Sequence, residues 1–254
     1  MSYTCTSTKP SPLPTIHLLC MEPIHITAFN AAAKTYSLPS SINLQIHHER
    51  LADLPQNNSL RFECIVSPAN SYARLDGGFD DALSRVFSPK GDYMALTRVA
   101  QERVWKEWRG FAPPGSCTMV DLAASDAEGE TKLMGNGWGC RYMALVPTMK
   151  IPQRVLWDRE VVYECMWALF NSVDKHNREF EEGNGDGKHV KIEGVLLTPF
   201  ATGCGDWSAE KWAAQLVLAI RHFVEAAEDE QGWAREGFVA IMEHHTELMD
   251  TYNL

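Results

Sequence analysis

The sequence lacks long apolar runs and closely spaced cysteines. No stretch approaches the roughly 18 consecutive apolar residues of a membrane-spanning helix, so no membrane partner is expected. The seven cysteines are odd in number and scattered, and none forms a Cys-x-x-Cys pair. The pattern therefore predicts neither a metal site nor a disulfide framework, and no cofactor is expected. Several cysteines stand in apolar runs as small hydrophobic residues, which is typical of a reducing compartment, cytoplasmic or nuclear.

Positive charge is also scarce. The chain has 23 Lys and Arg against 33 Asp and Glu, which gives a formal net charge of −10. Such a surface repels phosphate backbones, so nucleic acid is not expected as a partner. A small anionic ligand would have to be held by backbone N–H groups aimed at it locally.

What is present predicts one globular domain. The 254 residues are 45% apolar and 22% charged, as in ordinary globular proteins. Residues 1–14 are rich in Ser, Thr and Pro, lack the order of a secretory signal, and are expected to form a flexible tail. Residues 15–254 then form a single domain without a linker. Two polar, glycine-rich stretches, 123–137 and 179–188, are expected to be surface insertions on loops.

Short apolar runs alternate with segments of helical period, which indicates an α/β protein whose sheet is covered on both faces. Six runs are predicted to be strands, namely Ile16–Met21, Leu44–His47, Glu63–Val66, Cys117–Leu122, Tyr142–Pro147 and Val190–Thr198. Helical periods occupy 158–176, 213–224 and 238–249, and Ser208 is a predicted N-cap of the second of these helices.

Two strand–turn–helix units carry the candidate chemistry. In the first, Gly77 and Gly78 follow a predicted strand and open a segment of helical period. Glycine allows close backbone approach, and the free N–H groups at a helix entrance attract anions. In the second, the run Thr202-Gly203-Cys204-Gly205 again joins a strand to a helix, without a Walker-type lysine. In an α/β sheet such turns gather beyond the carboxyl ends of the strands, where ligands bind.

These segments resemble the macrodomain family. The run Ile65-Val66-Ser67-Pro68-Ala69-Asn70, continued by Leu75 to Leu83, is similar to the motif I-V-N-A-A-N, a run of glycines and V-D-x-A-I. The later run Leu197 to Gly205 resembles the second ligand loop of that family. The resemblance covers about residues 44–227. It implies a three-layer α/β/α sandwich with a central mixed sheet, and recognition of ADP-ribose or a close derivative.

The resemblance also implies roles for particular residues. Asn70 is expected to contact the distal ribose, and Asp80 matches a carboxylate that positions or activates water in the hydrolase branches, so both are catalytic candidates. The expected ligand-binding residues are Asn70, Asp76, Gly77, Gly78, Phe79, Thr202, Gly203, Cys204 and Gly205. Two positions depart from the family pattern. Ser67 replaces the first Asn of the motif, and Arg50 stands where the family has its adenine-binding Asp.

Simpler interpretations of the same residues stay open. Asn70 could cap its own loop, and Asp80 could stabilise the helix dipole. Cys204 has no His or Asn that the sequence pairs with it as a nucleophile. The neighbouring pairs His47-His48 and His244-His245 lack the i, i+4 spacing of a zinc helix and are expected to be surface or core histidines.

Three functions are compatible with the sequence. The leading hypothesis is an ADP-ribose-recognising enzyme that hydrolyses ADP-ribosyl linkages on proteins or ADP-ribose 1″-phosphate. The second is a non-catalytic module that binds ADP-ribose or another nucleotide. The third is a protein-interaction scaffold with a vestigial cleft.

Overall fold

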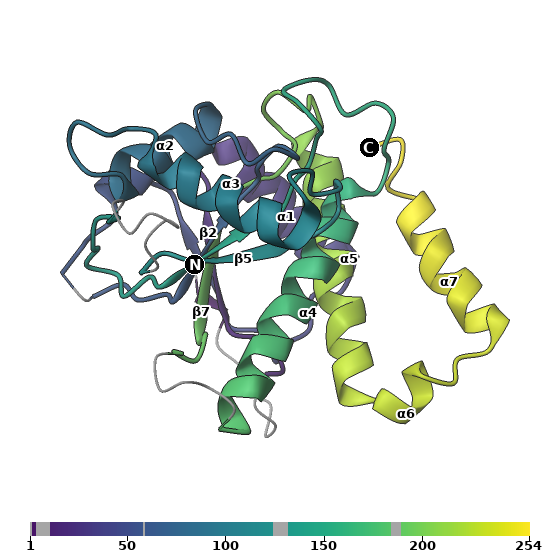
Figure 1. The fold of residues 1–254 in the computed structure, drawn as a ribbon. Helices are drawn as coiled ribbons and strands as arrows, with labels where there is room; N and C mark the ends of the chain where they lie inside the picture. Colours follow the sequence, from purple (N-terminus) through teal and green to yellow (C-terminus); the bar gives the residue numbers. More distant parts are fainter. Residues whose placement is uncertain (1, 4–10, 58, 124–131, 184–188) are drawn as a thin grey trace.

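The chain folds around a central seven-stranded sheet (Figure 1). The computed structural model describes residues 2–3, 11–57, 59–123, 132–183 and 189–254. The strands are β1 (Ser2–Tyr3), β2 (Thr15–Leu19), β3 (Leu44–His47), β4 (Cys64–Ser67), β5 (Thr118–Asp121), β6 (Tyr142–Leu145) and β7 (Gly194–Leu197). All six predicted strands are therefore confirmed. Their order is β1-β3-β2-β7-β4-β6-β5, and only the edge strands β1 and β5 pair antiparallel. The sheet is mixed, as expected.

The helices are α1 (Pro23–Thr35), α2 (Gly78–Phe87), α3 (Ala95–Trp108), α4 (Val161–Glu181), α5 (Ala209–Glu228), α6 (Glu230–Trp233) and α7 (Phe238–Met249), with a 3-10 turn at Leu51–Asp53. The helical periods correctly predicted α2, α4, α5 and α7. The predicted N-cap is confirmed, because Ser208 Oγ accepts from Lys211 N at 3.1 Å. Helices α1 and α3 were not predicted, since small residues such as Ala28, Ala32 and Ala100 fill much of their buried faces and weaken the apolar period. Among the described residues, none of the helices combines the length and apolar character needed to cross a membrane.

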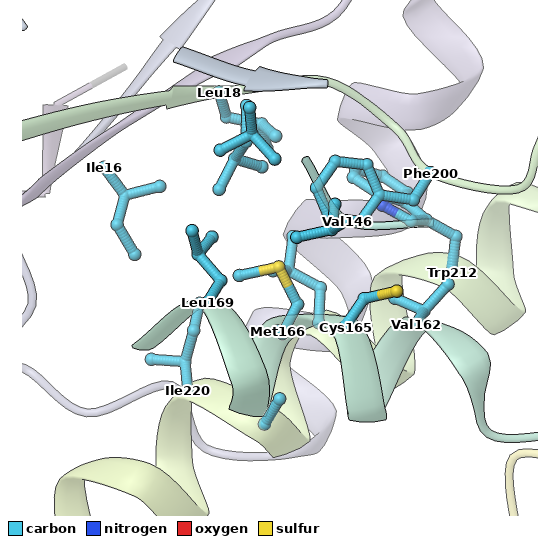
Figure 2. Packing of buried hydrophobic residues seen from close by; sticks show 14 of the residues in the cluster. Ile16, Leu18, Val146, Val162, Cys165, Met166, Leu169, Phe200, Trp212 and Ile220 are labelled. Carbon is cyan, nitrogen blue, oxygen red and sulfur yellow. The ribbon is translucent and has the colours of Figure 1, made fainter. Parts of the chain in front are cut away.

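Two hydrophobic layers cover the two faces of the sheet. Cys64 and Val66 of β4 belong to the layer that includes α1, α4 and α5, whereas Ile65 belongs to the layer that includes α2 and α3. This alternation follows from the two-residue period of a strand. Figure 2 shows part of the first layer, where Met166 and Leu169 of α4 lie among residues of the sheet and α5. The predicted three-layer α/β/α sandwich is the observed architecture.

The two expected insertions and the expected tail are described only in part. Residues 124–131, 184–188 and 4–10 lie outside the described residues. Within the expected tail, Ser2–Tyr3 pair antiparallel with β3, and Leu13 is buried. The last turn of α4 reaches Glu181, so the beginning of the stretch predicted as a loop from 179 is helical. The first residues of this stretch continue the helical period of α4, although the polar, glycine-rich composition of the stretch predicted a loop.

Candidate functional site

The sheet order brings the two glycine turns to one edge. Strand β7 pairs in parallel with β4, with Cys64 opposite Val195 and Ile65 opposite Leu196. The chain therefore leaves β4 after Ser67 and leaves β7 after Leu197 at neighbouring positions on the carboxyl edge of the sheet. This is the edge at which α/β proteins bind ligands.

A third loop, which follows β6, holds both glycine-bearing loops by hydrogen bonds. Ser71 N donates to Met149 O at 3.0 Å, which joins the loop after β4 to the loop after β6. Val155 N donates to Gly205 O at 3.0 Å, and Trp207 Nε1 donates to Val155 O at 3.1 Å. The turn after β7 is thus braced by the same segment. Sequence reasoning missed this segment, because nothing in its local pattern signals contacts with two distant loops.

The first glycine turn presents uncovered backbone. Gly77 is the N-cap of α2, and no side chain caps the helix there. Gly78 has a φ of +56°, a left-handed conformation that glycine adopts without strain. A Cβ built on either glycine would meet no heavy atom within 4 Å. The N-terminus of α2 is therefore open to an approaching anion. Beside it, the carboxylate of Asp76 is ion-paired with Arg74 at 2.6 Å and is partly exposed.

The second glycine turn is tightly wound but open at its tip. Trp207 N donates to Ala201 O at 3.1 Å, and both Ala201 (φ 58°) and Asp206 (φ 62°) adopt left-handed conformations. A Cβ on Gly205 would lie 2.3 Å from Ala201 O, so only glycine fits there. A Cβ on Gly203, in contrast, would meet nothing within 4 Å.

The tip of this turn also carries unpaired donors. Within the described part of the chain, the backbone N–H groups of Gly203 and Cys204 donate to no protein acceptor. Both residues are exposed, whereas Thr202 is half-buried, with its hydroxyl 3.5 Å from Pro199 O. Successive unpaired amides of this kind form a concave anion site.

The side chain of Asn70 stabilises its own loop. Its Oδ1 accepts from the backbone N–H of Tyr72 at 3.1 Å and of Arg74 at 3.3 Å, and its Nδ2 donates to Arg74 O at 2.8 Å. The loop-capping interpretation of Asn70 is therefore what the structure shows. These contacts use only one of the two amide N–H groups of the side chain.

Asp80 is buried at the start of α2 and is bonded to the end of β4. Ser67 Oγ donates to Asp80 Oδ1 at 2.6 Å, and the side chain of Asp80 is almost inaccessible to solvent. Burial raises the pKa of Asp80 to about 7, the hydrogen bond from Ser67 opposes this rise, and the charge of Asp76 adds to it. Ser67 was noticed in the sequence only as a departure from the family motif. Its position directly after a buried strand was the available signal for this contact.

Phe79, the remaining candidate, and two residues beside the turns have less specific surroundings. Phe79 is half-buried and packs on the α2–α3 layer. Asp81, next to Asp80, accepts from Tyr93 Oη at 2.6 Å and from Arg85 Nε at 2.8 Å, so its carboxylate is committed to neighbours on the surface. Trp207 is buried and braces the turn through its bond to Val155.

Several solved structures are similar to this chain. No protein-family model matches the chain. The macrodomain of Oceanobacillus iheyensis with ADP is similar over 67% of this chain and 71% of that chain, at 16% identity and a TM-score of 0.44. A mutant of that macrodomain with ADPR matches over 67% and 74% of the two chains, at 15% identity and a TM-score of 0.45. The same macrodomain with MES bound matches over 67% and 73%, at 16% identity and a TM-score of 0.43. These are distant similarities.

Proposed function

We propose that the carboxyl edge of the sheet binds ADP-ribose or a close derivative between the turns after β4 and β7. The observation that supports this most directly is the pair of uncovered backbone surfaces, at Gly77 and Gly78 on one side and at Gly203 on the other. The open N-terminus of α2 and the unpaired amides of the second turn supply donors for a diphosphate without requiring positive side chains. This arrangement suits a protein whose net charge is −10.

The proposal includes hydrolysis, with Asp80 as the proton-accepting group. A carboxyl whose pKa is about 7 changes its protonation state near neutral pH, which is the range in which a general acid or base is effective. In this scheme Asp80 takes a proton from water as the water oxygen attacks the anomeric carbon of the distal ribose. The bond from that carbon to the protein side chain or to the 1″-phosphate breaks, and the displaced group leaves with the electron pair. The free N–H of Asn70 contacts a ribose hydroxyl. The substrates would be ADP-ribosyl linkages on proteins or ADP-ribose 1″-phosphate.

A non-catalytic reader of ADP-ribose is the second candidate, and two observations favour it. The Asp80 carboxyl is buried and already accepts a bond from Ser67, so water reaches it only after a local movement. The amide of Asn70 is largely committed to its own loop. Both features are compatible with a site that binds a nucleotide and leaves it intact.

Two measurements test binding and catalysis separately. Calorimetry with ADP-ribose, ADP, AMP and ribose 5-phosphate should show binding that requires the diphosphate. If none of these compounds binds or raises the melting temperature, the nucleotide proposal fails. Hydrolysis of ADP-ribose 1″-phosphate and of an ADP-ribosylated protein is then compared for the wild type and Asp80→Asn. Binding by both proteins without turnover would establish the reader, whereas equal turnover by both would remove Asp80 from catalysis.

A further inference from the structure

A cluster of metal-ligating side chains lies far from the glycine turns, between α5 and α7. His222 is on α5, and His244 and Glu247 are on α7, which lies beyond α5 from the sheet (Figure 1). One ligand atom from each of the three lies within 4.8 Å of the other two. His222 Nε2 and Glu247 Oε2 are already 3.0 Å apart. Bonds of about 2.1 Å in a tetrahedral zinc site place donors roughly 3.3 Å apart, so a small approach of His244 completes the set.

The surroundings of the cluster orient its imidazoles. His222 is fully buried, and its Nδ1 lies 3.0 Å from the hydroxyl of Tyr163, which leaves Nε2 directed at Glu247. A carboxylate oxygen of Glu236 lies 3.0 Å from His244 Nε2. Hydrogen-bonding partners of this kind position the histidines of metal sites.

A cationic side chain is already in contact with the ligand atoms. Arg221 Nη2 is bonded to Glu247 Oε2 and lies 3.0 Å from His222 Nε2. It therefore meets both donors on the side where a cation would be held. Arg221 has a second acidic neighbour, Glu225, with Nε and Oε1 3.5 Å apart. The guanidinium can thus leave the cluster without losing every acidic partner.

Helix α7 has few other contacts to hold it in place. Leu248 is its only buried residue, while Phe238, Val239 and Ile241 are largely exposed. A helix with so little buried apolar surface gains little from packing. A ligand bound jointly by α5 and α7 would supply a cross-link that packing does not.

We propose that His222, His244 and Glu247 bind one zinc ion that fastens α7 to α5, with Arg221 replacing the metal as the local cation when zinc is absent. Two imidazoles and one carboxylate are donors that zinc prefers, and water can complete the tetrahedron. The sequence predicted no metal site because the ligands come from two helices and match no short motif. The proposal is independent of nucleotide binding at the glycine turns.

The test is a zinc titration of the chelator-treated protein, residues 1–254, in competition with a chromogenic chelator. We expect one zinc per chain, essentially complete loss in His244→Ala, and unchanged binding in His245→Ala, whose side chain is on the same helix but exposed. Tyr163→Phe should weaken binding roughly 10- to 100-fold, as expected for loss of an orienting partner. Cys204→Ser, which removes an exposed thiol outside the cluster, should bind zinc like the wild type. Absence of zinc binding, or equal binding by wild type and His244→Ala, would overturn the proposal.

Substitution of Arg221 predicts the direction of a change in zinc affinity, which a purely structural role of Arg221 would not produce. Arg221→Gln should bind zinc more tightly than the wild type, because the competing cation is removed. Zinc should also slow amide hydrogen exchange in 238–249 in the wild type and leave it unchanged in His244→Ala. Weaker zinc binding in Arg221→Gln, or no protection of α7 by zinc, would contradict the assignment. The visible spectrum of bound cobalt, a zinc substitute, reports four-coordination directly.

Discussion

The hydroxyl of Ser67 donates a 2.6 Å hydrogen bond to a carboxylate oxygen of Asp80, which ties the end of β4 to the first turn of α2. This contact lies at the junction between the sheet and the first glycine turn. Because both side chains are buried, the protonation state of Asp80 is coupled to folding as well as to any chemistry at the site.

The stability of the protein should therefore depend on Asp80 and on pH. The pKa of Asp80 is raised from 3.8 to about 7 on folding, so the folded state binds a proton that the unfolded state releases. Its contribution to stability is fully present below about pH 4 and is lost as pH rises through about 7. Asp80→Asn removes this titration. Melting temperatures should show the wild type losing stability relative to Asp80→Asn between pH 4 and 7, and parallel curves would contradict the burial of a titrating carboxyl.

Removing the hydroxyl of Ser67 should lower the free energy of unfolding more when Asp80 is ionised than when it is protonated. Ser67→Ala leaves a buried carboxylate oxygen without its donor, which costs about 1–3 kcal/mol of the free energy of unfolding. Urea unfolding at pH 8 and pH 5 should show the larger loss at pH 8, where the carboxylate is charged. The double variant Ser67→Ala/Asp80→Asn is the control, because the two changes should not be additive. Additive losses would mean that the hydrogen bond contributes nothing.

The two glycines of the second turn should respond to substitution in opposite ways. Gly203→Val adds a side chain where there is open space, so the free energy of unfolding should change by less than about 0.5 kcal/mol. The added side chain would occupy the proposed diphosphate site, and ADP-ribose affinity should fall at least about tenfold, or about 1.4 kcal/mol. Calorimetry and urea unfolding of the same variant check both parts. Normal affinity in a folded Gly203→Val protein would place the ligand elsewhere.

Gly205→Ala is the matched contrast to that variant. Its Cβ would lie 2.3 Å from Ala201 O, a backbone atom that cannot rotate away. We expect a loss of about 1–3 kcal/mol in the free energy of unfolding, typical of overpacking. An unchanged melting temperature would show that the turn is looser than its geometry indicates.

Cys204 should report ligand binding by its reactivity toward thiol reagents. Cys204 is exposed, while Cys20 is buried and Cys117 is half-buried, and burial raises the pKa of both of the latter thiols to about 12. Labelling of the native protein should therefore be faster at Cys204 than at these two residues, and ADP-ribose should slow it. The Cys204→Ser variant identifies the signal by its disappearance. Labelling that ADP-ribose leaves unchanged would argue against a ligand at the second turn.

The sequence by itself determined the local elements of this protein. The six predicted strands are observed as four- or five-residue segments whose apolar residues alternate between two core layers, and α4 and α5 repeat apolar residues every three or four positions. Ser208 and the two glycine turns were also visible, because caps and turns depend on residues close together in the chain. Helices α1 and α3 were not predicted, because their small buried residues leave little periodic signal in the sequence.

Only the tertiary structure decided what these elements do together. The insertion of β7 between β2 and β4 brings the loops that carry the two glycine turns to the same edge of the sheet, and it depends on pairing between residues about 130 positions apart. The burial that raises the pKa of Asp80, and the approach of His222 to His244, likewise arise from packing between separate elements. Local periodicity cannot encode such contacts, because desolvation and distance are set by which surfaces meet after the chain has folded.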